Sequence, residues 1–159
     1  MKEINHEIFG KIKLNRNWWE REENVDFYKK NIVITIGING TEEAEFEQTQ
    51  IDAFSRFLQN IEKLLLDAEL SIYEYYQEVY LDYRERQEDS ADQVAPIISS
   101  MEEAGDLVQL NEIIFPWSFK TGIRKVGILL NCTWEPEHGL AVKFEDEKIV
   151  EVGYQDIVL

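Results

Sequence analysis

Few cysteines, few basic residues and no long apolar run occur in this sequence. Cys132 is the only cysteine, so no internal disulfide can form, which a reducing compartment allows. The longest uninterrupted apolar run is three or four residues, far short of the roughly 20 that span a membrane. The first residues hold no apolar segment of the kind that a secretory signal needs. We therefore expect a cytoplasmic protein that does not enter a membrane.

Basic side chains are scarce: the 159 residues include 16 Lys and Arg against 32 Asp and Glu, for a net charge of −16. They occur in isolated groups such as Lys29-Lys30 and Arg124-Lys125, so we expect no direct nucleic-acid binding. The glycines Gly37 and Gly40 are followed by glutamates and by no lysine, which excludes a phosphate loop. The motifs G-x-S-x-G, Cys-x-x-Cys and HExxH are also missing. The sequence thus indicates no enzyme class and no cofactor.

The chain nevertheless contains enough apolar material for a folded protein. Hydrophobic residues make up 44% of it, and the aromatic residues comprise four Trp, seven Tyr and eight Phe. A chain of this length buries roughly 70% of its unfolded surface. No repeat, low-complexity tract or linker divides the sequence, so we expect a single domain over residues 1–159.

Strand patterns fill the first forty residues. Apolar residues alternate with lysines from Ile8 to Leu14, and a β-branched run from Ile32 to Ile38 stops at the turn pair Asn39-Gly40. Residues 18–28 between them predict a middle strand with a turn at Glu23-Asn24. We expect a three-stranded antiparallel meander.

From about residue 48 the apolar period changes to that of a helix. The apolar positions of this stripe are Ile51, Phe54, Leu58, Ile61, Leu65, Ala68, Ile72, Tyr76, Val79 and Tyr83. A straight helix of about 37 residues is about 55 Å long, whereas a compact domain of this size is about 40 Å across. We therefore expect a break near Asp67–Ser71 and two helices; a single protruding helix is the alternative.

The remainder of the chain predicts one short helix followed by strands. Ser99 with Glu102, or Ser100 with Glu103, forms a capping box that opens a helix to about Leu110. Period-2 patterns then predict strands at 113–119, 123–131, 140–144 and 148–152, with the turn between the last two at 145–147. Strands at both ends of the chain and two to three central helices indicate an α+β fold with a mainly antiparallel sheet.

The negative charge is concentrated in one segment. Residues 41–110 contain 18 acidic and 4 basic side chains, a net of −14 out of −16. A charge concentrated in this way produces a directed field that attracts a basic protein partner. Tyrosines add contact area beside the carboxylates that steer such a partner. The residues that we expect at this contact are Glu69, Tyr73, Glu74, Glu78, Tyr80 and Asp82. An ordinary solvated helix face is the competing interpretation.

The segment from Cys132 to Gly139 groups several unusual residues in one loop. Cys132, His138 and a carboxylate form one candidate metal site, although zinc sites usually show paired ligands at short spacing. Glu137 and His138 form a candidate acid/base pair, but neighbours in an extended segment point to opposite faces. A third reading is structural: Gly139 helps fix the turn and Trp134 packs at the sheet edge.

The sheet itself provides a further candidate. If one face of it stays uncovered, Trp18, Trp19 and Trp117 are placed to line a cavity for a small ligand rather than to fill a core. An intracellular scaffold or sensor domain that binds a small ligand in this way is the alternative that stands beside protein binding.

The block from Val126 to Val142 resembles a bacterial family of uncharacterised acidic domains. The specific part is Trp134–Gly139, including Glu135, Glu137 and His138, which is similar to a W-[D/E]-x-E-H-G motif. The family also shows a closing V-G-x-x-D segment, here Val152–Asp156. Glu135 stands where aspartate is more usual. The resemblance implies a suspected immunity protein encoded beside a polymorphic toxin, and it implies no catalytic residues.

Overall fold

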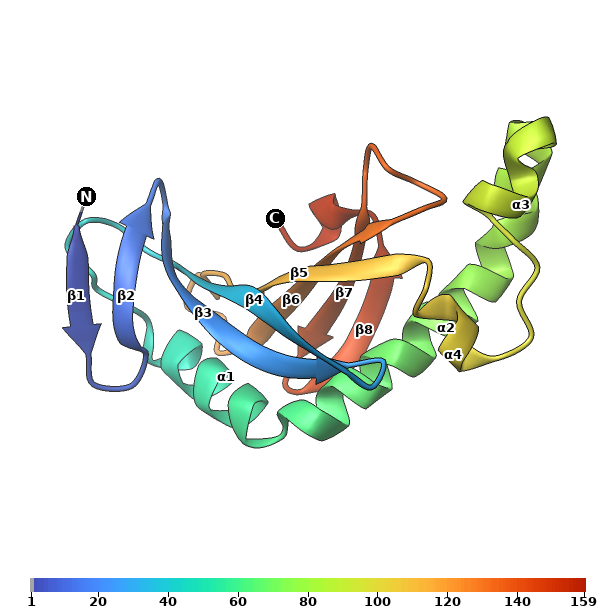
Figure 1. The fold of residues 1–159 in the computed structure, drawn as a ribbon. Helices are drawn as coiled ribbons and strands as arrows, with labels where there is room; N and C mark the ends of the chain where they lie inside the picture. The colour runs from blue at the N-terminus through green and yellow to red at the C-terminus, as the bar shows by residue number, and fades with distance from the viewer. Residues whose placement is uncertain (1) are drawn as a thin grey trace.

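The computed structural model describes residues 2–159, which form a twisted sheet with a layer of helices against one face (Figure 1). The eight strands are β1 (Glu3–His6), β2 (Gly10–Asn15), β3 (Trp18–Phe27), β4 (Lys30–Asn39), β5 (Val108–Phe115), β6 (Lys125–Cys132), β7 (Leu140–Glu145) and β8 (Lys148–Gly153). The helices are α1 (Gln48–Gln59), α2 (Ile61–Gln87), α3 (Ala91–Val94) and α4 (Met101–Ala104), with 3-10 turns η1 (Glu88–Ser90) and η2 (Gln155–Ile157).

The strands lie in the sheet in the order in which they occur in the chain. Neighbouring strands are antiparallel except β4 and β5, which are parallel, with Ile36 opposite Ile113. A parallel pair needs a long crossover, and the helical segment between β4 and β5 provides it. The α+β class and the mostly antiparallel sheet are confirmed.

The N-terminal strands differ in detail from the sequence prediction. β3 is one continuous strand that pairs with β4 from Trp18 to Phe27, so the predicted turn at Glu23-Asn24 is wrong. The turn falls at Tyr28-Lys29, where both residues have left-handed φ angles of 49° and 63°. Two-residue hairpins favour this conformation because it matches strand twist. Its usual signal is a glycine or asparagine, which this turn lacks.

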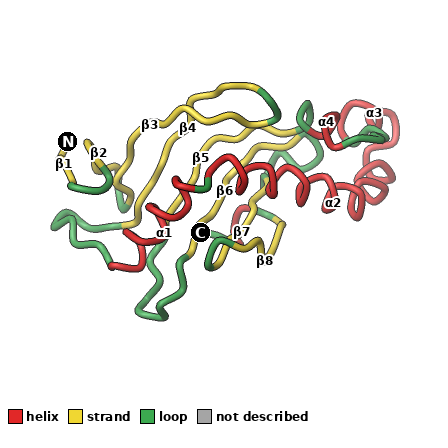
Figure 2. The backbone as a smooth tube through the Cα atoms, turned by 90° about the horizontal axis from the view of Figure 1, so that it is seen from below, coloured by secondary structure: helices red, strands yellow, loops and turns green. Residues whose placement is uncertain are grey.

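The long helical stretch breaks at Asn60 and not at Asp67–Ser71. The Asn60 N–H donates to the carbonyl of Phe57, and its side chain donates to the carbonyl of Arg56, which closes the last turn of α1. α2 then runs unbroken for 27 residues, or about 40 Å. It fits because its C-terminal end extends past the strands (Figures 1 and 2).

The short helix predicted from the capping box is present but shorter than expected. Ser100 is the N-cap of α4, and its hydroxyl accepts a hydrogen bond from the Glu103 N–H at 3.4 Å. The helix ends at Ala104 rather than near Leu110, because β5 already begins at Val108. β5 in turn ends at Phe115, before Pro116 and short of the predicted residue 119.

The two faces of the sheet are covered differently. α1 and α2 bury one face, where Trp19, Ile36 and Ile128 are fully buried. The other face, called the open face below, carries a small apolar cluster in which Val158 from the C-terminal segment packs on Ile114. Within residues 2–159, none of the helices combines the length and the apolar character needed to cross a bilayer.

Candidate functional site

The last turns of α2, with η1 and α3, extend past the strands at one end of the molecule (Figure 1). We call residues 74–94 the acidic arm. Its exposed carboxylates are Glu74, Glu78, Asp82, Glu85, Glu88, Asp89 and Asp92. The two basic residues of this segment are engaged locally: Arg84 contacts Asp92 at 2.8 Å, and Arg86 lies over the Tyr83 ring. The surface of the arm is therefore strongly negative.

The six residues predicted for the contact surface fall into three groups. Glu74, Glu78 and Asp82 are exposed on α2. Tyr73 and Tyr80 are half-buried and pack against the core.

The sixth residue, Glu69, is a correction because it is only 5% exposed. Its carboxylate accepts a hydrogen bond from the Tyr28 N–H at 3.1 Å, within the left-handed turn between β3 and β4. Burial raises the pKa of Glu69. Glu69 thus supports a turn that lacks glycine and does not belong to an outer surface.

Sequence reasoning missed three leucines on the outer face of α2. Leu66, Leu70 and Leu81 are 58%, 48% and 62% exposed. Their spacing of four and eleven residues places them on one side of the helix. On the helical wheel they lie between the half-buried tyrosines and the carboxylates. They were detectable as apolar residues that fall off the buried stripe.

The loop from Cys132 to Gly139 packs against the start of the acidic arm. Trp134 is 2% exposed, and its ring meets that of Tyr76 edge-on at 4.8 Å. The Glu135 carboxylate accepts a hydrogen bond from the Tyr83 hydroxyl at 2.8 Å, and it lies 3.0 Å from His138 Nδ1. Tyr154 stacks on His138 with ring centroids 4.7 Å apart. We call Tyr83, Glu135, His138 and Tyr154 the Glu135 clasp.

Hydrogen bonding and charge within the clasp stabilise the ionised forms of Glu135 and His138. Although burial acts to raise the pKa of Glu135, the hydrogen bonds from His138 and Tyr83 lower it overall. The hydrogen bond to Glu135 raises the pKa of His138. Burial raises the pKa of the Tyr83 hydroxyl, which therefore stays protonated and donates.

The C-terminal segment completes this loop. Gly139 has φ of 64°, and a Cβ there would lie 2.5 Å from Gln155 Nε2. The Gln155 side chain donates to the carbonyl of Leu130, and its N–H donates to the carbonyl of His138. The two segments that carry the suggested motifs, 134–139 and 152–156, therefore contact each other directly.

The chemical readings of this loop fit the geometry poorly. The carboxylate partner of His138 is Glu135, while Glu137 is exposed to solvent. The second of the two histidines in the sequence, His6, cannot join His138 in a site, because it stacks on Phe9 beside β1, at the opposite end of the sheet (Figure 1). Burial raises the pKa of Cys132 to about 12, which makes it a poor nucleophile and metal ligand. In the described part of the chain, no three His, Cys, Asp or Glu side chains are placed to share a metal ion.

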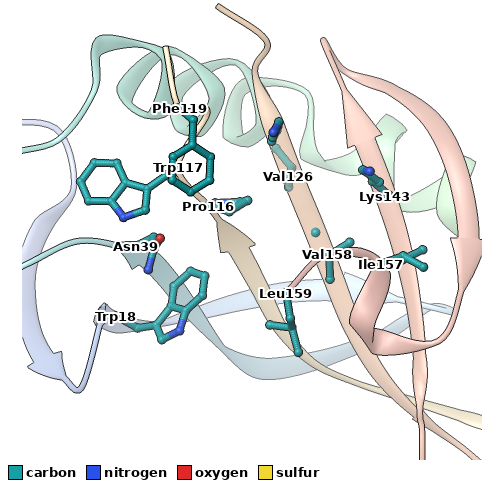
Figure 3. A pocket seen from close by; sticks show the side chains of 12 residues that line it. Trp18, Asn39, Pro116, Trp117, Phe119, Val126, Lys143, Ile157, Val158 and Leu159 are labelled. Atoms are coloured by element: carbon teal, nitrogen blue, oxygen red, sulfur yellow. The ribbon is translucent and has the colours of Figure 1, made fainter. Parts of the chain in front are cut away.

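The open face of the sheet holds a cavity of about 290 Å³. Trp18 and Trp117 line it, as the sequence hypothesis requires, whereas Trp19 points into the core and is fully buried. The assignment of Trp19 to a cavity is therefore wrong, because consecutive residues of β3 face opposite sides of the sheet. Figure 3 shows Trp18 and Trp117 on one side of the cavity and Lys143, Ile157 and Val158 on the other.

The chain belongs to a family described as a domain of unknown function (DUF6985), whose sequence profile matches residues 8–159. No curated protein and no solved structure matches the chain. The family description carries no activity, so the W-[D/E]-x-E-H-G motif and the immunity role stay predictions.

Proposed function

We propose that this protein is an acidic protein-binding module that inhibits a basic partner of the toxin or nuclease type. The observation that carries the proposal is the charge distribution: residues 41–110 hold a net charge of −14 out of −16. Much of this charge lies on the outer face of α2 and on the acidic arm. A field of this kind accelerates the encounter with a positively charged protein.

The outer face of α2 supports a protein contact better than a merely solvated helix does. Leu70 and Leu81 are exposed beside Glu74, Glu78 and Glu85. Apolar side chains rimmed by charges are typical of protein-binding surfaces. The opposite side of α2 is fixed by Ile72 and Tyr76, which are fully buried. A surface held on a rigid helix loses little entropy when it binds.

The immunity role rests on the family resemblance of residues 134–139. An inhibitor that must neutralise a toxin in its own cell needs a high association rate. The acidic arm supports such a rate, and the absence of catalytic motifs in the sequence agrees with an inhibitor that acts by binding alone.

The proposal is tested by co-purification with the basic protein encoded by the adjacent gene, followed by calorimetry at low and high salt. We expect nanomolar binding that weakens as salt rises, because screening shortens the range of the field. The variant Glu74→Lys/Glu78→Lys/Asp82→Lys should abolish binding. The matched control, Glu7→Lys/Glu22→Lys/Glu42→Lys, changes the net charge equally at exposed sites away from α2 and should bind nearly as well as the wild type.

Two outcomes oppose the proposal. No binding at either salt concentration excludes this partner and the immunity role with it. Equal losses in both triple variants show that only the total charge matters, so that α2 is no specific contact surface.

A further inference from the structure

The cavity on the open face is built from apolar and aromatic walls that come from three parts of the chain. Trp18 belongs to β3, Trp117 and Phe119 to the loop after β5, and Ile157 and Val158 to the C-terminal segment. Two glycines of the sheet lie under these walls: Gly127 lines the cavity itself, and Gly37 lies beneath the Trp18 ring. A Cβ at Gly37 would come within 3.3 Å of the Trp18 ring, and one at Gly127 would come within 2.7 Å of Val158. The small residues let both walls lie close to the sheet.

The loop after β5 is held in a strained conformation. Phe119 and Lys120 have left-handed φ angles of 53° and 63°, yet neither is a glycine. The Glu47 carboxylate anchors them: it accepts hydrogen bonds from the Ser118 N–H at 2.6 Å and from the Lys120 N–H at 2.9 Å. Although burial acts to raise the pKa of Glu47, these bonds lower it overall.

The consequence of this anchor is an aromatic rim. Phe119 is 77% exposed at the cavity. Strain of this kind persists where the surroundings fix it, and it concentrates at ligand sites. The anchored loop thus holds an exposed aromatic side chain at the edge of the cavity.

The charge of the cavity is opposite to that of the protein. The charged side chains among its lining residues are those of Lys125 and Lys143, in a chain of net charge −16. Among the described residues, Lys125 makes no ion pair, and Lys143 only approaches Glu145 at 3.9 Å. Asn39 lies between the two tryptophans (Figure 3) and donates its side-chain N–H to the carbonyl of Asn17. Its amide oxygen stays available to accept a hydrogen bond.

We propose that this cavity binds a small planar aromatic carboxylate, with its ring against Trp18 and Trp117 and its carboxylate toward Lys125 and Lys143. Ligand pockets typically measure about 300–1,000 Å³, so a cavity of about 290 Å³ suits one or two fused rings. Flat tryptophan walls favour a flat ring, and the lysines favour an anion. The site lies on the face of the sheet opposite α2, so it goes beyond the proposed function and does not depend on it.

The experiment uses 2-naphthoate as the probe and 2-naphthalenemethanol as its neutral counterpart. The indole N–H signals of the four tryptophans are followed by nitrogen-15 correlation spectra of the full chain. They are assigned through Trp18→Phe and Trp117→Phe. We expect 2-naphthoate to shift the signals of Trp18 and Trp117 and to leave those of the buried Trp19 and Trp134 in place. The neutral probe should bind several times more weakly.

Variants separate the ring contact from the charge contact. Lys125→Gln should weaken 2-naphthoate binding about fivefold, as expected for a partly exposed charge pair, and adding Lys143→Gln should weaken it further. The control Lys30→Gln changes an exposed lysine away from the cavity and should have no effect. Trp117→Ala should remove binding of 2-naphthoate. Phe119→Ala should also weaken it, and this variant should fold normally because the Phe119 side chain is 77% exposed.

Three results would overturn the proposal. The first is that millimolar 2-naphthoate leaves the tryptophan signals unmoved. The second is that both probes bind equally whatever residue stands at 125 and 143. The third is that the Trp117 signal moves with protein concentration alone, which would show that a second copy of the chain covers the open face. The Glu74→Lys/Glu78→Lys/Asp82→Lys variant should bind 2-naphthoate like the wild type, so failure of the protein-binding proposal leaves this result unaffected.

Discussion

The hydroxyl of Tyr83 provides the sharpest test of the structure, because one oxygen atom joins α2 to the loop that carries the suggested family motif. Tyr83 is 6% exposed, and its hydroxyl donates to a Glu135 carboxylate whose side chain is 13% exposed. A hydrogen bond to a charged group contributes about 1.5–3 kcal/mol to stability. Glu135 keeps His138 as a partner and some contact with water. We therefore expect Tyr83→Phe to lower the free energy of unfolding by about 1–2 kcal/mol.

The assay is urea and thermal unfolding, in which this loss lowers the melting temperature by about 3–6 °C for a chain of this size. Tyr80→Phe is the matched control, because Tyr80 is half-buried on the same helix and its hydroxyl makes no hydrogen bond within residues 2–159. It should change stability by less than about 0.5 kcal/mol. If both variants are equally stable, the Tyr83–Glu135 bond does not hold the loop and the reasoning fails.

The pH dependence checks the same bond independently. The folded pKa of Glu135 lies below its unfolded value of 4.5. Its stabilising contribution is thus present above that pH and is lost as the pH falls through the folded pKa. Tyr83→Phe removes part of this contribution. The difference between wild type and variant should be full near neutral pH and should shrink in acid; a constant difference contradicts the assigned partner.

Three further predictions follow from other contacts. His138→Gln should destabilise the protein below pH 6.5, because the folded pKa of His138 is raised and its charged ring is stabilised by Glu135. As the pH rises through the folded pKa of His138, the variant should become as stable as the wild type. Urea unfolding midpoints measured over this pH range test the prediction. Gly127→Ala should cost about 1–3 kcal/mol and speed amide exchange at Val158, because the new Cβ would lie 2.7 Å from that side chain. Cys132 should react with a thiol reagent at pH 8 only upon unfolding, because it is 5% exposed and burial raises its pKa to about 12.

The periodic features of the fold were predictable, while its interruptions were not. Period-2 and helical patterns are repeated over many residues, so they indicate the strands at both ends and the helices between them. The break at Asn60 leaves no such signal, because the apolar stripe continues through Leu58 and Ile61. A helix longer than the domain needs no break at Asp67–Ser71 because it can extend past the sheet, as α2 does.

The site residues were predictable where exposure follows from the helical period alone. Glu74, Glu78 and Asp82 are exposed as expected. Glu69 is buried because a turn far away in the sequence needs an acceptor for the Tyr28 N–H, and no local pattern records that need. The partner of His138 was missed although it is close in the sequence. The loop turns so that Glu135, three residues earlier, contacts the histidine, whereas the prediction considered only the adjacent Glu137.

The two proposed surfaces lie on opposite faces of the sheet and differ in the charge of their side chains. The helix layer contains most of the acidic segment, and its field favours a basic protein on α2. The open face lies across the sheet and the core from that layer, and Lys125 and Lys143 line its apolar cavity. A basic protein bound at α2 and an aromatic carboxylate bound on the open face would therefore not compete for the same surface. Charge reversal on α2 and neutralisation of the two lysines should consequently have independent effects, as expected for distant sites without shared partners.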